Sequence, residues 1–280
     1  MIFKDNLAVL DTRIATEFQH QHLVNSVNIP WQLLNVRLNE LPARGTELNI
    51  VCSGESDAKK ITHFLTEKNY IVKQIVFAKE LEKFLAKHSK YRETGRQKTT
   101  LWIPSMLILD FIKHCSLVPN LSSVLDIGCG GGRDAVFLSK QGFNVTAIEK
   151  NKQVISRAQF LADNTQQKIK WLTCNVSHPD CLPDKQFNVI VIIRYLNRDL
   201  ITWIKNHTPL GGFLVFQAFS EGVQAFGSPK NPNFIVQEHE FAKTFGKSQG
   251  FEIIIDKIET LKDGRPIASF IAKRVEEKQQ

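Results

Sequence analysis

Hydrophobic positions alternate between two spacings along the chain. Short apolar runs indicate strands, and apolar residues three and four positions apart indicate helices. In the first part of the chain, strands are predicted at residues 7–11, 48–52 and 71–77, and helices at residues 58–69 and 79–88. Strands and helices that alternate in this way are typical of a small, mostly parallel sheet.

A second series of strands and helices begins at Leu101. Helices are predicted at residues 106–114, 134–141 and 152–164, and strands at residues 123–127, 144–149, 169–174, 187–193 and 213–218. Two longer strand patterns, 251–259 and 266–274, flank Asp263-Gly264, a dipeptide that favours a hairpin turn. The sheet is therefore expected to end in an antiparallel pair, and the fold class is α/β.

The 280 residues divide into two expected domains, 1–88 and 101–280. Residues 89–100 are polar and basic without an apolar period, which predicts a linker.

The composition, with 42% hydrophobic and 23% charged residues, is that of a soluble globular protein. No apolar stretch is long enough for a membrane helix, and no secretory signal is recognisable at residues 1–6. The five cysteines stand singly, without the spacing of metal ligands, so we expect a reduced, cytoplasmic protein without a metal site. The net charge of +8 permits contact with RNA, but the basic residues are spread over both halves of the chain.

Candidate chemistry concentrates in a glycine-rich segment at residues 124–134 that joins a predicted strand to a predicted helix. Glycines here allow positive φ and close approach of a ligand. Asp126 and Asp134 flank the loop, and carboxylates suit a cationic ligand better than a pyrophosphate. Glu149, at the end of the next strand, is placed to bind the two hydroxyls of a ribose.

These motifs resemble the class I S-adenosylmethionine-dependent methyltransferases over residues 101–274. The resemblance implies a seven-stranded Rossmann-like sheet whose last strand is antiparallel. It places Glu149 at the ribose hydroxyls, Asn175 and Val176 at the adenine, and Arg194 near the reacting centre, although the family often has Asp where Asn175 stands. The full expected cofactor set is Asp126, Gly128, Cys129, Gly130, Gly132, Asp134, Glu149, Lys150, Asn175, Val176 and Arg194.

The Gly-x-Gly-Arg-Asp continuation is similar to the tellurite-resistance and thiopurine-type branch, which methylates small soft nucleophiles. An acceptor that reacts as a thiolate or oxyanion needs a positive field, which Arg194 and Arg198 could supply. We therefore expect Arg194, Tyr195 and Arg198 at the catalytic centre, and we interpret residues 221–234, after the fifth strand, as a substrate lid.

Residues 1–88 resemble the rhodanese family through Asp11-Thr12-Arg13, Glu17-Phe18 and Asn28-Ile29-Pro30. This resemblance implies a small parallel sheet and a sulfur-carrying cysteine. An alignment on the strand end makes Cys52 the candidate, whereas an alignment on Ser53-Gly54 puts Val51 at the catalytic place and Cys52 beside it. The loop after Cys52 is short, lacks the usual arginine and carries Glu55 and Asp57, which oppose a thiolate. A degenerate domain is therefore favoured over an active one.

The leading hypothesis is an S-adenosylmethionine-dependent methyltransferase with a small-molecule acceptor. Three alternatives stay open: an RNA methyltransferase, a non-catalytic protein that binds S-adenosylmethionine, and a bifunctional enzyme that uses a reactive Cys52. The sequence does not indicate the oligomeric state.

Overall fold

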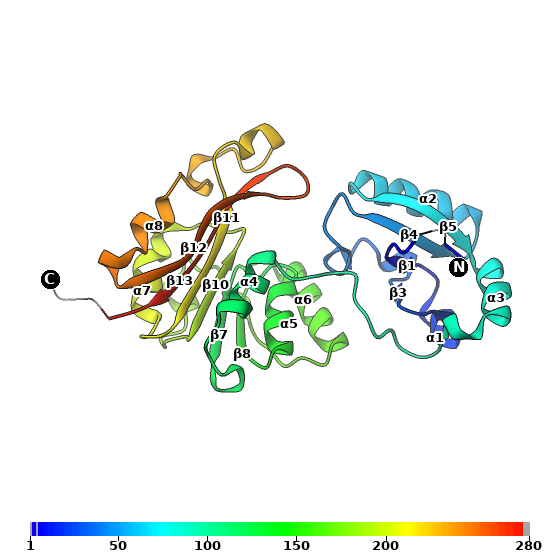
Figure 1. Cartoon of the computed structure of the whole chain (residues 1–280), viewed down its shortest axis with the longest axis horizontal. Coiled ribbons are helices and arrows are strands. Elements are labelled where there is room, and N and C mark those ends of the chain that lie inside the picture. Colours follow the sequence, from blue (N-terminus) through cyan, green and yellow to red (C-terminus); the bar gives the residue numbers. More distant parts are fainter. Residues whose placement is uncertain (1, 4, 277–280) are drawn as a thin grey trace. The chain divides into compact units, whose positions relative to one another are not determined.

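The chain forms two compact units, Met1–Ile103 and Pro104–Gln280 (Figure 1). The structure is a computed structural model that describes residues 2–3 and 5–276. Each unit contains a sheet with helices on both of its faces, and each is described separately below.

The first unit contains a four-stranded parallel sheet with the strand order β3-β1-β4-β5. Strands β2 and β6 form a separate two-stranded antiparallel sheet. The strands are β1 (Val9–Asp11), β2 (His22–Leu23), β3 (Val27–Asn28), β4 (Glu47–Cys52), β5 (Ile71–Phe77) and β6 (Arg92–Glu93). The helices are α1 (Ala15–His20), α2 (Glu55–Glu67) and α3 (Ala78–Lys87), with short 3-10 helices η1 (Trp31–Leu33), η2 (Leu38–Glu40) and η3 (Ser89–Tyr91).

Alternate side chains of the small sheet enter two separate hydrophobic clusters. Leu10 and Ile50 pack with Ile61 of α2, whereas Val9 and Val51 belong to the cluster that contains the buried leucines of α3. The period of two along each strand therefore places one helix on each face.

Residues 89–97, inside the segment predicted to be a linker, are tied to the first unit. Strand β6 pairs with β2, the Gly95 N–H donates to the Gln19 carbonyl, and the Gln97 side chain accepts the Asn28 N–H. A strand of two residues is too short to show an apolar period, which is why these residues were predicted to be a linker.

The second unit contains a seven-stranded sheet in the order β12-β13-β11-β10-β7-β8-β9. The strands are β7 (Ser123–Ile127), β8 (Asn144–Ile148), β9 (Lys170–Leu172), β10 (Val189–Ile193), β11 (Phe213–Phe219), β12 (Phe251–Thr260) and β13 (Pro266–Arg274). The helices are α4 (Met106–His114), α5 (Arg133–Lys140), α6 (Lys152–Asn164), α7 (Ile201–His207) and α8 (Glu240–Thr244). Short 3-10 helices are η4 (Pro119–Leu121), η5 (Pro179–Cys181), η6 (Arg198–Leu200), η7 (Val223–Phe226), η8 (Pro232–Phe234) and η9 (Lys247–Gln249).

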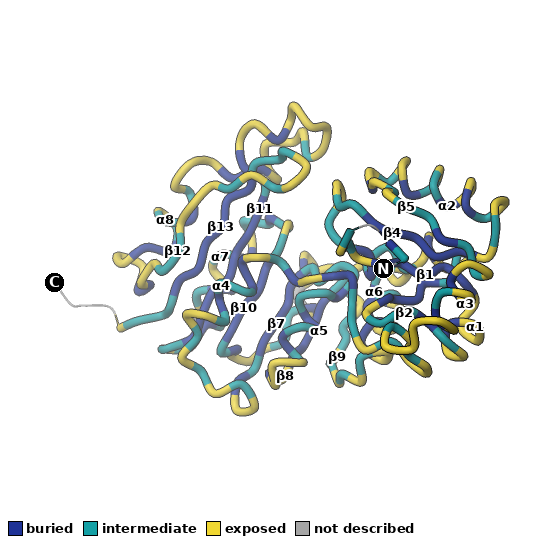
Figure 2. The backbone as a smooth tube through the Cα atoms, turned by 45° about the vertical axis from the view of Figure 1, so that its right-hand side comes forward, coloured by how far each residue is buried: buried dark blue, intermediate teal, exposed yellow. Residues whose placement is uncertain are grey.

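The expected seven-stranded sheet with an antiparallel strand is confirmed. Strand β13 runs antiparallel to both β11 and β12, and the remaining neighbours are parallel. The five inner strands are largely buried, whereas the edge strands β12 and β9 are mostly exposed or half-buried (Figure 2). Helix α4 packs on one face beside Val189 and Val191, and α7 and α8 pack on the other beside Ile190 and Ile192.

Two features of this unit differ from the sequence prediction. Helices α7 and α8 were not predicted, because they have 7 and 5 residues and are too short for a recognisable amphipathic period. The expectation that all cysteines are single and reduced is wrong for one pair, since Cys174 and Cys181 form a disulfide. The turn that follows β9 brings them together, and nothing in their sequence spacing revealed it.

Candidate active site

The glycine-rich loop lies at the carboxyl edge of the large sheet, between β7 and α5. Strand β7 is central, with β10 and β8 as its neighbours. The N–H groups of Gly128 and Cys129 donate to the carbonyl of Ile148, which ends β8. The loop is therefore fixed to the neighbouring strand at the edge where parallel α/β sheets bind ligands.

Two positions of this loop require glycine for different structural reasons. Gly132 has φ 77°, and a Cβ built there would lie 2.6 Å from the Ala158 Cβ, so its absence lets α5 approach α6. Gly130 has φ 52°, and a Cβ there would meet nothing within 4 Å. The main chain at Gly130 is thus open on the side where a ligand would approach.

Three carboxylates surround the loop. Asp126 is 1% exposed, and its Oδ2 atom has no hydrogen-bond partner among the described residues. Burial, together with the negative charges of Asp134 and Glu149, raises the pKa of Asp126 well above its usual range. Burial also raises the pKa of Asp134, although the Ser105 N–H donates to its Oδ1 at 2.6 Å. A positive charge would relieve the mutual repulsion that raises these pKa values, so the group of carboxyls favours a cationic ligand.

Glu149 follows β8 and is oriented by the backbone. Its Oε1 accepts the Asn151 N–H at 2.8 Å, and its own N–H donates to the Leu172 carbonyl. Lys150 beside it is exposed. One carboxylate oxygen of Glu149 is thus held by the main chain at the beginning of α6.

The segment after β9, expected at the adenine, contains one exposed and one buried residue. Asn175 is exposed, and its side chain accepts the Ser177 N–H, whereas Val176 is 9% exposed and belongs to the hydrophobic core. The Cys174–Cys181 disulfide closes this turn.

Of the three residues expected at the catalytic centre, two lie beside the glycine loop. Arg194 directly follows β10, and its N–H donates to the Gln217 carbonyl at 2.7 Å. The Tyr195 ring covers Gly128, where a Cβ would lie 3.3 Å from its Cγ atom.

The guanidinium of Arg198, the third of these residues, is hydrogen-bonded to residues 233–240. Its guanidinium donates to both carboxylate oxygens of Glu240 and to the carbonyls of Asn233 and Ile235. Arg198 therefore anchors the end of the segment expected as a lid. The Phe226 ring of that segment lies against Gly264 in the β12–β13 turn.

The sequence analysis did not identify a chain of three hydrogen-bonded polar side chains near the loop. The Ser105 side chain donates to Gln217, whose amide in turn donates to Ser269 on β13. Gln217 and Ser269 are buried inside strands, so the pattern of hydrophobic residues gave no reason to single them out.

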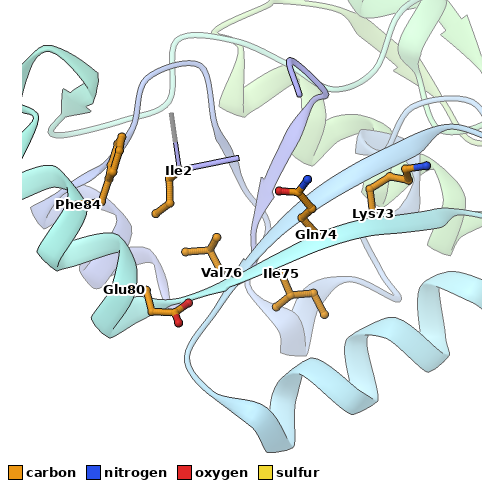
Figure 3. A pocket seen from close by; sticks show the side chains of 7 residues that line it. All are labelled: Ile2, Lys73, Gln74, Ile75, Val76, Glu80 and Phe84. Atoms are coloured by element: carbon orange, nitrogen blue, oxygen red, sulfur yellow. The ribbon is translucent and has the colours of Figure 1, made fainter. Parts of the chain in front are cut away.

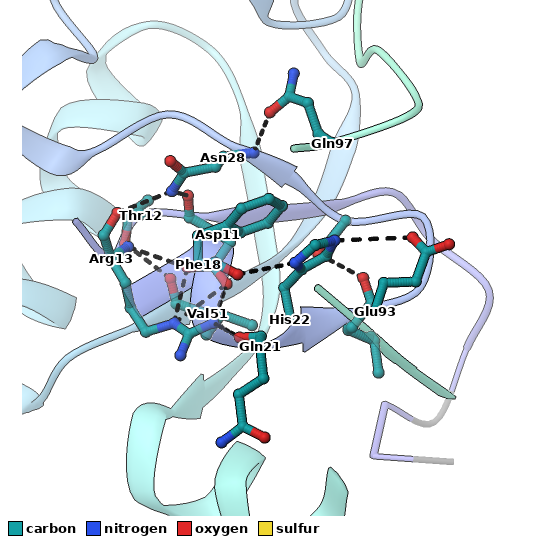
Figure 4. A network of polar contacts seen from close by, with 12 residues as sticks. Asp11, Thr12, Arg13, Phe18, Gln21, His22, Asn28, Val51, Glu93 and Gln97 are labelled. Carbon is teal, nitrogen blue, oxygen red and sulfur yellow. Dashed lines mark hydrogen bonds and ion pairs between the residues drawn. The ribbon is translucent and has the colours of Figure 1, made fainter. Parts of the chain in front are cut away.

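The Asp-x-Arg motif of the first unit forms a buried ion pair (Figure 4). Arg13 and Asp11 are 2% and 0% exposed, and the Arg13 Nη2 lies 2.7 Å from the Asp11 Oδ2. The Arg13 Nη2 also donates to the Gln21 carbonyl, and the Asn28 side chain donates to the carbonyls of Asp11 and Arg13. With its donors directed inward, the motif holds the loops around β1 together.

Cys52, the candidate nucleophile, is the last residue of β4 and is fully buried. Burial, with smaller contributions from Asp57 and Asp11, raises its pKa to about 11. Only Ser53 and Gly54 separate β4 from α2, so there is no loop of backbone N–H groups around the sulfur. The thiol is protonated and inaccessible at neutral pH, which does not suit a nucleophile.

An open hollow lies along strand β5 of the first unit (Figure 3). Ile2, Val76 and Phe84 give it an apolar part, while Lys73 pairs with Glu47 and Glu80 accepts the Phe77 N–H. Its charged groups are already engaged. Among the described residues, no group of three or more His, Cys, Asp or Glu side chains could hold a metal ion, and no helix is long and apolar enough to cross a membrane.

The seven-stranded sheet, the open glycine loop and the strand-end carboxylate define the class of protein: this is an S-adenosylmethionine-dependent methyltransferase. Comparison with known families identifies the family of methyltransferases to which it belongs. The family described as "Tellurite resistance protein TehB" matches residues 108–260, and the chain belongs to this family.

Individual relatives match different parts of the chain. An uncharacterized protein of Schizosaccharomyces pombe, UNK4.09, is 24% identical over 98% of this chain and 96% of its own length. The ubiquinone biosynthesis O-methyltransferase of Rickettsia typhi is 28% identical over 53% of this chain and 64% of its own length. The solved structure of TehB from Haemophilus influenzae has a TM-score of 0.49 and 23% identity, covering 60% of this chain and 61% of that one.

Proposed function

We propose that this protein transfers the methyl group of S-adenosylmethionine to a small-molecule acceptor that reacts as a thiolate or an oxyanion. The observation that carries the proposal is the open glycine loop at Gly130, with carboxylates on one side and the Arg194–Tyr195 turn on the other. The names of two relatives support this class of acceptor, since one refers to tellurite resistance and the other to O-methyl transfer.

The residues of the loop fit this cofactor. Asp126 offers a buried carboxylate oxygen without a partner, and the three carboxylates together attract a cation. The carboxylate of Glu149, held by the Asn151 N–H, can accept hydrogen bonds from two ribose hydroxyls. When bound, the cofactor supplies a methyl carbon that its sulfonium makes electrophilic.

The protein's contribution is alignment and charge rather than acid–base chemistry. With the cofactor bound, a lone pair of the acceptor would displace the sulfonium sulfur from the methyl carbon, and the electron pair of the broken bond would go to sulfur. Arg194 and Tyr195, next to Gly128, would orient the acceptor for this in-line displacement. No proton has to move if the acceptor is already an anion.

For the first unit, we propose a degenerate rhodanese-like domain that does not transfer sulfur. The burial of Cys52 and the two-residue connection to α2 support this role. The match to UNK4.09 over nearly its whole length supports both units acting in one protein.

The test is calorimetric titration with S-adenosylmethionine and S-adenosylhomocysteine. We expect micromolar binding that weakens at least tenfold in Glu149→Ala, about 1.4 kcal/mol. Glu252→Ala is the matched control, because this exposed carboxylate is the second residue of β12, at the opposite edge of the same sheet. Absence of binding by folded protein would refute the proposal.

Acceptors are then screened with radiolabelled cofactor, using thiols, tellurite and tRNA. Transfer of the label to tRNA would contradict a small-molecule acceptor and support an RNA methyltransferase. Binding without turnover on any acceptor would favour a non-catalytic cofactor-binding protein.

A further inference from the structure

The chain leaves β9 beside the glycine loop. Strand β9 pairs in parallel with β8, so that Leu172 stands opposite Ile148, and the Glu149 N–H donates to the Leu172 carbonyl at 3.1 Å. The Cη2 atom of Trp171, on the same strand, lies 3.3 Å from the position of a Cβ built on Gly132. The segment that follows β9 therefore begins at the carboxyl edge of the sheet, next to the glycine loop and to the carboxylate proposed to bind the ribose.

A disulfide joins the two ends of this segment, residues 174–181, which we call the disulfide turn. Cys174 and Cys181 are separated by seven positions. Inside the turn, the Asn175 carbonyl accepts the His178 N–H at 2.9 Å, and the His178 carbonyl accepts the Cys181 N–H at 3.0 Å. Each of these hydrogen bonds spans only part of the turn, whereas the disulfide spans all of it. The covalent bond therefore fixes the distance between the two ends.

The two sulfurs of the disulfide differ in their surroundings. Cys181 is 6% exposed and belongs to the hydrophobic core of the unit. Cys174 is half-buried, and its neighbours Thr173 and Asn175 are exposed. A thiol reagent in solution therefore approaches the bond from the side of Cys174, and the Cys181 sulfur is the one that leaves.

The turn carries the residues expected at the adenine. Asn175 and Val176 directly follow Cys174, one exposed and the other 9% exposed in the core. A loop that is already held in its bound conformation does not have to be ordered when the ligand arrives, which strengthens binding. Whether the disulfide is closed or open should therefore change the affinity for a ligand that contacts this turn.

We propose that Cys174 and Cys181 form a reversible thiol–disulfide switch, in which the closed disulfide holds the turn ready for the adenine and its reduction weakens cofactor binding. This inference rests on the proposed function and adds a regulation of the same site.

The co-reactant of the switch is a dithiol. One of its thiolates attacks the Cys174 sulfur, the bond to Cys181 breaks, and the electron pair of that bond goes to the Cys181 sulfur. The second thiolate of the reagent then displaces Cys174 from the mixed disulfide. Each departing cysteine thiolate takes up the proton that an attacking thiol released, so the dithiol is oxidised to a disulfide while the two cysteines are reduced to thiols.

The experiment measures cofactor affinity in both states of the full chain. The protein is oxidised with oxidised glutathione or reduced with dithiothreitol, and mass spectrometry after alkylation in denaturant verifies each state. The probe is S-adenosylhomocysteine, titrated by calorimetry, because thiolates do not attack its thioether. We expect the oxidised protein to bind it about fivefold or more tightly than the reduced protein, and reoxidation to restore the affinity.

Two variants separate the switch from general effects of the reductant. Cys174→Ser should bind like the reduced wild type and should not respond to dithiothreitol. Cys115→Ser is the matched control, because Cys115 is a free, half-buried cysteine of the same unit. This control should keep the affinity of the oxidised wild type and its response to dithiothreitol. Circular dichroism at the assay temperature shows whether each form is folded.

Three results would overturn the inference alone. They are binding by the reduced protein that equals or exceeds binding by the oxidised protein, absence of the disulfide after oxidation, and unfolding of the whole unit on reduction, which would make the bond a structural bridge. If the oxidised, folded wild type itself fails to bind S-adenosylhomocysteine, the proposed function fails, and this inference fails with it.

Discussion

The glycines of the cofactor loop allow a sharp test, because two of them share a positive φ but differ in what surrounds them. Gly130 and Gly132 both have positive φ, 52° and 77°. A Cβ at position 130 meets nothing within 4 Å, while a Cβ at position 132 would lie 2.6 Å from the Ala158 Cβ and 3.1 Å from its Cα. The Cα belongs to the backbone of α6, so it cannot move aside as a flexible side chain could.

The expected loss of stability follows from these contacts. A left-handed conformation costs an L-residue about 1–2 kcal/mol, which applies to both Gly130→Ala and Gly132→Ala. Overpacking between α5 and α6 adds about 1–3 kcal/mol for Gly132→Ala alone. We therefore expect a loss of about 1–2 kcal/mol at position 130 and about 2–5 kcal/mol at position 132.

The assay is urea denaturation of the full chain, followed by tryptophan fluorescence and circular dichroism. The Trp171 ring would lie 3.3 Å from the new Cβ at position 132, so its emission reports on this region. Titration of S-adenosylhomocysteine separates the two roles, since Gly130→Ala should remain folded and lose binding. Equal stability of the two variants would refute the reasoning from helix packing.

Three further outcomes are expected. The raised pKa of Asp126 means that the folded chain keeps a proton that the unfolded chain has released. The free energy of unfolding therefore falls as pH rises from the ordinary range of Asp through the raised pKa, by up to about 1.4 kcal/mol per pH unit. Because the pKa of Asp134 is raised as well, urea midpoints across this range should show that Asp126→Asn makes the slope shallower without abolishing it, and an unchanged slope would contradict the assignment. Reduction of the Cys174–Cys181 disulfide should lower the free energy of unfolding by about 2.5 kcal/mol for a loop of this length, with Cys181→Ser insensitive to reductant. Cys52, with a pKa of about 11, should resist iodoacetamide at pH 7.5 until the chain is denatured, as mass spectrometry would show; rapid labelling of the folded protein would revive sulfur chemistry.

The repeating order of strands and helices was determined by the local sequence. Helices α4 and α6 and strands β5, β7 and β13 begin and end where the apolar pattern predicted, because each must bury a face whose period is visible in the sequence. The β12–β13 hairpin followed from Asp263-Gly264, since the turn has positive φ at Gly264, where a glycine is favoured.

The short elements could be recognised only in the folded structure. Helices α7 and α8 and the pairing of β2 with β6 depend on contacts with residues far away in the sequence, not on a period of their own. The same is true of the Cys174–Cys181 pair, which the turn after β9 brings together.

For the site, the sequence determined which residues could carry the chemistry, because a glycine loop and a strand-end carboxylate are local motifs. Only tertiary structure decided which of them remain available. In the folded chain Arg198 is paired with Glu240, and Cys52 and Val176 are buried. Arg265 lies at the same edge of the large sheet as Arg194. The physical reason is that charge and accessibility are properties of surroundings, and distant strands supply those surroundings only when the sheet has formed.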